Sequence, residues 1–143
     1  MTLRREAFLD HVKERGEYGT AEEAERAARV VLALLGAHLV GEVRALLVAR
    51  LSEDFALLLL NPLQRAGPLP PERFVRATAA WIEGATERTA TWDLSAVLST
   101  VADTAGEDLM GQILLQHPAG YDLHFGRPQP TWPPVPHTGT TQS

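Results

Sequence analysis

TAEEAERAARVVLALLG, residues 20–36, is the stretch of sequence that decides the fold. Its apolar residues recur every three or four positions, which is the spacing of one face of an α-helix. This stripe consists of Ala24, Ala28, Val31, Leu32 and Leu35. The sequence therefore predicts an amphipathic helix that ends near Gly36 and buries the stripe.

The start of this helix is marked by a capping box. Thr20 stands at the N-cap and Glu23 follows three residues later. In such a pair each side chain accepts a hydrogen bond from a backbone N–H that has no partner inside the helix. The carboxylates of Glu22 and Glu23 also favour the positive end of the helix dipole.

Further helices are predicted on both sides of this one. Residues 3–15 carry apolar side chains at helical spacing, as do residues 40–51 and 53–60. Ser52 is expected to cap the last of these. Residues 61–71 are rich in Pro and Gly and are predicted to form a linker.

After the linker the apolar pattern starts again, displaced by 66 residues without a gap. The aligned pairs include Phe8 with Phe74, Val31 with Val97, Leu47 with Ile113, Phe55 with Tyr121, and Leu59 with Phe125. We therefore expect an all-α domain of about eight helices, made of two tandem copies over residues 3–60 and 72–125. Thr86 repeats the N-cap, but Thr89 replaces the carboxylate of the capping box.

The composition changes at residue 126. Five prolines alternate with Gln, Thr and Trp132, and the last six residues are small and polar. Such a segment cannot bury a core of its own. We expect a two-repeat domain over residues 1–125 and a disordered Pro-rich tail over residues 126–143.

Five short pieces of the chain resemble a bacterial family called domain of unknown function 2267. These pieces are FLDHV at 8–12, YGTAEEAERA at 18–27, LSEDF at 51–55, PERF at 71–74 and YDLHF at 121–125. The resemblance covers about residues 5–125, closely in the first half and loosely in the second. It implies an all-helical fold, and it implies no activity or functional residues.

Charge and composition favour a soluble cytoplasmic protein. The net charge is −5, and without Arg127, the only charge beyond residue 125, the domain carries −6. An acidic body repels phosphate backbones, so nucleic acid is not expected as a partner. The most apolar run, residues 30–40, is far shorter than the ~20 residues of a membrane span. The chain has no cysteine and no apolar leader.

No catalytic or metal motif stands out, so we expect no cofactor and no catalytic residue. His38 and Glu42 have the spacing of two ligands on one helix face, but a third ligand is not evident, and a histidine at a helix junction is the simpler interpretation. Ser52, Ser95 and Ser99 do not lie in a nucleophile turn. No phosphate-binding glycine loop occurs.

The candidate ligand-binding residues are Trp92, His117 and His124. His124 aligns with Leu58, so a histidine has replaced an apolar residue of the first copy. Such a replacement marks either a site or a repeat edge exposed to solvent. Trp92 is expected in the core or at its edge.

The candidate interaction residues are Leu57, Leu60 and Trp132. Residues 57–60 are all leucine and cover every side of a helix, so some of them face the other copy or another molecule. Trp132 lies in a Pro-rich strip of the kind that docks into aromatic grooves, although most such tails are spacers.

The sequence favours a non-enzymatic protein-interaction or regulatory module that binds an unknown protein or itself. This interpretation rests on excluding catalytic motifs and on the use of helical repeats as binding surfaces. The alternative is a small-ligand-binding protein or enzyme with its site between the two copies.

The predicted core placement of Val31 can be tested by substitution. Val31→Asp places an unpaired charge on the inner stripe of the second helix, so we expect the variant not to fold. Circular dichroism and thermal unfolding measure this directly. A soluble variant with the original helical signal and melting temperature would contradict the placement.

Overall fold

The computed structural model describes residues 5–39, 41–60, 69–82, 84–117, 121 and 124–125 of the 143-residue chain. Within these residues every regular element is helical, which confirms the predicted all-α class. The elements are α1 (Arg5–Gly16), α2 (Ala21–Leu35), a short 3-10 helix η1 (Gly36–His38), α3 (Gly41–Val48), α4 (Glu53–Leu60), α5 (Pro71–Trp81), α6 (Glu87–Ala105) and α7 (Glu107–Leu115).

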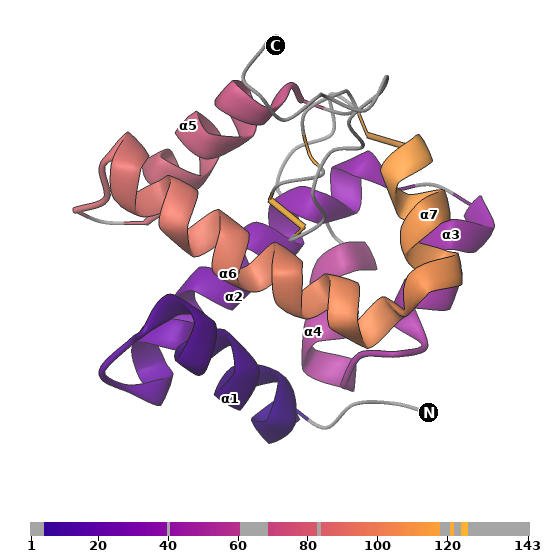
Figure 1. Cartoon of the computed structure of the whole chain (residues 1–143), viewed down its shortest axis with the longest axis horizontal. Coiled ribbons are helices and arrows are strands. Elements are labelled where there is room, and N and C mark those ends of the chain that lie inside the picture. Colours follow the sequence, from indigo (N-terminus) through magenta and orange to yellow (C-terminus); the bar gives the residue numbers. More distant parts are fainter. Residues whose placement is uncertain are drawn as a thin grey trace, which may run out of the picture.

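Helices α2 and α6 cross the middle of the molecule and pack against each other (Figure 1). Helices α1 and α5 lie at one end of this pair, and each of them contacts both α2 and α6. At the other end α4 packs on α2, α7 packs on α6, and α3 packs on α4 and α7. Segments from both halves of the sequence therefore meet along α2 and α6.

The capping box that starts α2 forms as the sequence predicts. Thr20 Oγ1 accepts the Glu23 N–H at 3.2 Å, and Glu23 Oε1 accepts the Thr20 N–H at 3.2 Å. Helix α6 has the same arrangement without a carboxylate: Thr89 Oγ1 accepts the Thr86 N–H at 2.9 Å. A hydroxyl group at the third position is therefore sufficient to complete the box.

The core lies between α2 and α6 and the helices that cover them. All five residues of the predicted α2 stripe are buried, including Val31. Helix α6 is buried on more than one side, and its buried residues include the polar side chains of Asp93 and Thr100 as well as its apolar stripe. The large aromatic side chains of the core are Phe8, Phe55, Phe74, Tyr121 and Phe125.

Two local predictions are wrong. Helix α3 ends at Val48 instead of near Leu51, because the chain turns there and the Arg50 N–H bonds to the Leu47 carbonyl at 2.9 Å. Ser52 precedes α4 but does not cap it through its side chain: among the described residues its buried hydroxyl has no hydrogen-bond partner. The Ser52 carbonyl instead accepts the first helical N–H bond, from Ala56.

Other predictions fall outside the described residues. These are residues 61–68 of the linker, the Pro-rich tail at 126–143 with Trp132, and the last of the eight predicted helices, because only 121, 124 and 125 are described between residue 117 and the tail. Among the described helices none is long and apolar enough to cross a membrane.

Gly36 allows η1 to lie directly against α4. Its φ of −55° is open to any residue, so the requirement for glycine comes from space and not from conformation. A Cβ atom at this position would lie 2.4 Å from the backbone oxygen of Leu59. The contact is with backbone, which cannot rotate away as a side chain can.

Substituting this glycine is expected to destabilise the domain. Gly36→Ala must push α4 outward, and such overpacking typically costs ~1–3 kcal/mol. Gly111→Ala is the matched control: a Cβ in the middle of α7 meets nothing within 4 Å, and we expect a gain of up to ~1 kcal/mol from helix propensity. Urea unfolding compares the two variants. Equal stability of the two would contradict the close approach.

Candidate functional site

A groove runs between α1 and α6. Two hollows lie along it, and their linings are largely apolar. The first has a volume of about 160 Å³ and is lined by Arg15, Trp92, Ser95, Ala96 and Ser99. The second has a volume of about 140 Å³ and is lined by His11, Thr100, Asp103 and Thr104. An ion pair between Arg15 of α1 and Asp103 of α6 joins the two linings.

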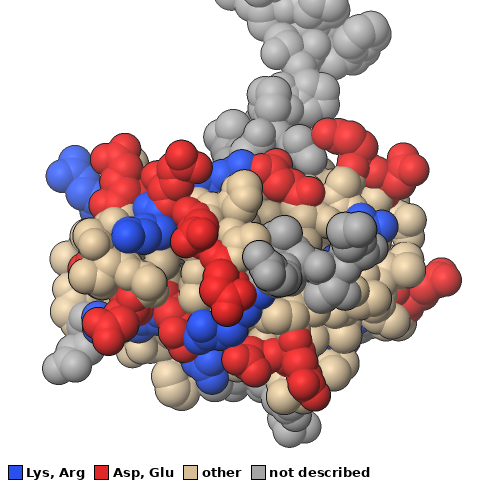
Figure 2. Space-filling model, turned by 90° about the horizontal axis from the view of Figure 1, so that it is seen from below, with Lys and Arg blue, Asp and Glu red and all other residues tan. Residues whose placement is uncertain are grey.

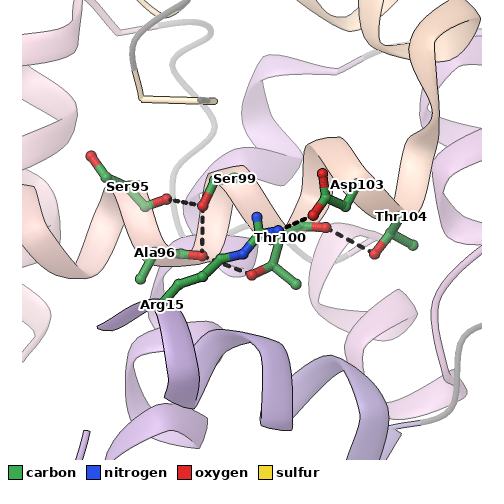
Figure 3. A network of polar contacts seen from close by, with 7 residues as sticks. All are labelled: Arg15, Ser95, Ala96, Ser99, Thr100, Asp103 and Thr104. Carbon is green, nitrogen blue, oxygen red and sulfur yellow. Dashed lines mark hydrogen bonds and ion pairs between the residues drawn. The ribbon is translucent and has the colours of Figure 1, made fainter. Parts of the chain in front are cut away.

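The α6 side of the groove is a stripe of small hydroxyl side chains (Figure 3). Their protons are donated to carbonyls of the same helix: Ser99 to Ser95 at 2.7 Å, Thr100 to Ala96 at 2.9 Å, and Thr104 to Thr100 at 2.9 Å. A hydroxyl that bonds back to its own helix offers no free donor to a ligand. What the stripe offers a ligand is therefore mainly space, because its side chains are small.

The turn that joins α1 to α2 is fixed to the start of α6. The Trp92 indole N–H donates to the Gly16 carbonyl at 2.7 Å, and the Tyr18 hydroxyl donates to Asp93 Oδ1 at 2.5 Å. Two consecutive residues of α6 thus hold both sides of the turn. Trp92 lies at the edge of the core with 52% of its surface exposed.

This turn has a strained backbone. Glu17 adopts a φ of 55°, in the left-handed region that non-glycine residues seldom occupy. Gly16 beside it leaves room for the Tyr18 ring, which would have to shift for a Cβ atom, since that atom would lie 2.2 Å from the ring. The bonds from Trp92 and Asp93 stabilise a conformation that the turn does not favour by itself.

A third hollow lies on the other side of the turn. It has a volume of about 140 Å³ and is lined by Tyr18, Glu23, Arg26, Ala27, Ile82 and Asp93. Asp93 is only 9% exposed. Burial raises the pKa of its carboxyl group, and the hydrogen bond from Tyr18 opposes part of that rise. Burial also raises the pKa of Tyr18, with a further contribution from its bond to Asp93.

The sequence analysis did not select Tyr18 or Asp93 as site residues. One signal was available: Asp93 aligns with Ala27, so a carboxylate has replaced an alanine of the first half at a helix position that is buried in both. Its partner Tyr18 is 75 residues away along the chain, and nothing in the sequence pairs the two.

The predicted ligand residues lie in two places. Trp92 and Ser95 line the same hollow, and Ser95 Oγ lies 3.1 Å from His124 Nδ1. His117 lies deeper, with its ring centroid 4.7 Å from that of Tyr121, which in turn lies 6.2 Å from that of His124. The structure therefore connects Trp92 to His124 through Ser95 but places His117 in a buried aromatic cluster.

The Ser95–His124 pair has two of the three parts of a nucleophilic site. Burial lowers the pKa of His124, which keeps the imidazole neutral and able to accept a proton. Nucleophilic catalysis also needs a group that orients the base. No described residue other than Ser95 is bonded to His124. The contact joins His124 to α6.

The predicted interaction leucines lie on the surface of α4. Leu57 and Leu60 are both exposed and one turn apart, whereas Leu59 between them is buried and Leu58 packs partly against the core. Of the four leucines, two therefore serve the core and two face outward.

Among the described residues no group of three or more His, Asp or Glu side chains is placed to hold a metal ion. On the face seen in Figure 2 acidic side chains are prominent and basic ones are interspersed among them. Some basic groups are paired, as Arg5 is with Glu25 at 2.7 Å and with Asp54 at 3.2 Å.

The bond between Tyr18 and Asp93 can be tested by a double substitution. Tyr18→Phe leaves a buried carboxylate without its donor, so we expect a loss of ~1–3 kcal/mol and a further rise in the pKa of Asp93. Adding Asp93→Ala, the residue type of the first half, removes the unpaired group, so the double variant should be more stable than Tyr18→Phe. Chemical unfolding and carbon NMR of the carboxyl group measure both effects. A double variant that is less stable than Tyr18→Phe would contradict the assignment.

Comparison with known proteins places the chain in a family. Residues 5–123 match the model of a family described as "Uncharacterized conserved protein (DUF2267)". No curated protein and no solved structure matches the chain. The matched range covers well over half of the sequence and agrees with the resemblance seen in its capping and packing motifs. The chain belongs to the DUF2267 family.

Proposed function

We propose that this protein is a protein-binding module and that its binding surface is the α1–α6 groove with Trp92 at one end. The observation that carries the proposal is the state of Trp92, which is half exposed and yet held in one orientation by its hydrogen bond to Gly16. Tryptophan is among the residues that contribute most to protein interfaces.

The size of the hollows favours a polypeptide partner over a free metabolite. Pockets for small molecules typically enclose ~300–1,000 Å³. The two groove hollows enclose about 160 and 140 Å³. A cavity of ~150 Å³ accommodates one benzene-sized group. Each hollow therefore fits a single side chain of an apposed chain.

The fixed geometry of the surface also supports binding. Ordering a side chain at an interface costs ~0.5–1.5 kcal/mol of free energy. Trp92 is already ordered by Gly16, and Arg15 is already ordered by Asp103. Both side chains can contact a partner with little further loss of conformational freedom.

We infer further that the domain consists of two tandem copies, of which only the second supplies the Trp92 side of the groove, while α1 of the first copy supplies the other side. The helix starts support the inference, since α1 and α5, α2 and α6, and α3 and α7 each begin 66 residues apart. At the positions of Trp92, Ser95 and Ser99 the first copy has Arg26, Arg29 and Ala33. A surface present in one copy alone gives the domain one binding site instead of two.

Substituting Trp92 tests the proposal. We expect Trp92→Ala to weaken binding of a partner by at least ~30-fold, which corresponds to the ~2 kcal/mol of a hot-spot residue. Trp81→Ala is the matched control, because Trp81 is exposed to a similar extent but lines neither groove hollow. Quantitative affinity capture with wild type and both variants identifies the partner, and calorimetry with the purified partner measures the affinities.

Two outcomes would contradict this function. If Trp92→Ala and Trp81→Ala lose binding equally and both keep their helical circular dichroism, the groove is not part of the interface. Native mass spectrometry of gently purified protein gives the second: a small molecule retained on the folded species would favour the alternative, a ligand-binding protein or enzyme.

A further inference from the structure

A buried cluster of histidine and tyrosine side chains lies where the chain enters α5. His38 of η1 is 2% exposed, and its ring centroid lies 4.8 Å from that of His117, 4.9 Å from that of Phe74 and 5.6 Å from that of Tyr121. The groove function proposed above uses none of these residues.

The cluster holds both backbone groups of Leu69, which directly precedes the N-cap of α5. The Leu69 N–H donates to His38 Nε2 at 3.1 Å. The Leu69 carbonyl accepts the Tyr121 hydroxyl proton at 2.5 Å. Residues from two distant segments thus bind one residue from opposite sides, and both bonds are partly buried.

These bonds fix the protonation of the two histidines. His38 accepts at Nε2, so a neutral ring carries its proton on Nδ1. His117 Nδ1 lies 2.8 Å from the Ile113 carbonyl, so its proton is on Nδ1 and its Nε2 is bare. The two remaining nitrogens, His38 Nδ1 and His117 Nε2, are buried without a partner among the described residues.

The same tautomers exclude a metal bridge between the rings. To coordinate a metal through Nδ1, His38 would have to carry its proton on Nε2. That proton would point at the Leu69 N–H. The hydrogen bond would be lost, and two donors would face and repel each other. The two free nitrogens therefore do not form a pair of ligands in this arrangement.

The fold does not need polar groups at these positions. In the first half the counterparts of His117, Tyr121 and His124 are Leu51, Phe55 and Leu58, and these pack as ordinary core residues or against the core. A buried polar group without its partner costs ~1–3 kcal/mol. The cluster bears this cost at His38 Nδ1 and His117 Nε2, and an apolar cluster would avoid it.

Protonation of the cluster is not compensated by neighbouring charges. Burial, together with a smaller contribution from the nearby His117, lowers the pKa of His38 to about 3. Burial also lowers the pKa of His117, which its bond to Ile113 partly opposes. Among the described residues, the charged side chains nearby are Glu72, which acts on Tyr121, and Arg44, which bonds to the carbonyls of Gly36 and Leu39 beside His38. His124 is the other titratable neighbour, and burial lowers its pKa as well.

We propose that the His38–His117–Tyr121 cluster is an acid-sensitive latch that holds Leu69, and with it the start of α5, against the bundle. A proton on His38 Nε2 removes the acceptor of the Leu69 N–H and places a charge 4.8 Å from a second histidine ring. The latch is closed when both rings are neutral. It weakens as the pH falls below ~6.5, the ordinary pKa of a histidine side chain. Below that pH the rings bind protons when the latch is open but not when it is closed, so acid favours the open state.

Hydrogen exchange of the full chain tests the latch. We expect the protection of the Leu69 amide, corrected for its intrinsic exchange rate, to fall between pH 7 and pH 5. The expected change is roughly 30-fold for His38 alone, since pH 5 lies ~1.5 units below the ordinary pKa of histidine. Protection of core amides such as that of Val97 in α6 should fall less.

Three variants separate the latch from general acid effects. His38→Gln keeps an acceptor for Leu69 but does not titrate, and His117→Leu restores the residue type of Leu51. Each should reduce the pH dependence of the Leu69 amide, whereas His11→Gln, on the exposed side of α1, should leave it unchanged. The proposal is overturned if the Leu69 amide follows Val97 at every pH, or if His38→Gln and His117→Leu leave its pH dependence as in wild type.

Discussion

The contact between α2 and α6 is the interaction on which the rest of the domain depends. Helices α1, α4, α5 and α7 each pack on at least one of these two, and α3 packs on α4 and α7. The apolar stripes of α2 and α6 form the centre of the buried core, and side chains from the other helices pack around them. Because burial of apolar area is the main favourable term in folding, loss of this contact would leave every other helix without a surface to pack on.

Most of this architecture was predictable from local sequence signals. The Thr20 capping box and the apolar stripe ending at Leu35 predicted α2, and the bounds predicted for α4 agree with the structure. These signals are local, so they can be read along the chain. The predicted cap at Ser52 was wrong because a serine before a helix is only a local, statistical signal. Whether its hydroxyl is buried without a partner depends on the tertiary fold.

The candidate site was predictable only in part. Trp92, His117 and His124 were the predicted ligand residues, the last because a histidine stands where the first half has Leu58. All three lie at the groove or in the buried cluster. The pairing of Tyr18 with Asp93 and the hold on Leu69 were missed, because each joins residues that are 31 to 75 positions apart. Periodicity reports which face of a helix is buried, but it does not report which helix covers that face.

The attachment of the Gly16–Tyr18 turn to α6 also bears on how the chain folds during its synthesis. The turn is made early, but the partners of Gly16 and Tyr18 follow 76 and 75 residues later. Until α6 leaves the ribosome, the strained turn has nothing to hold it and the inner faces of α1 and α2 remain open to solvent. Long-range contacts of this kind slow folding and prolong the exposure of apolar surface. The nascent first half is therefore the stage of synthesis at which apolar surface of this domain stays exposed the longest.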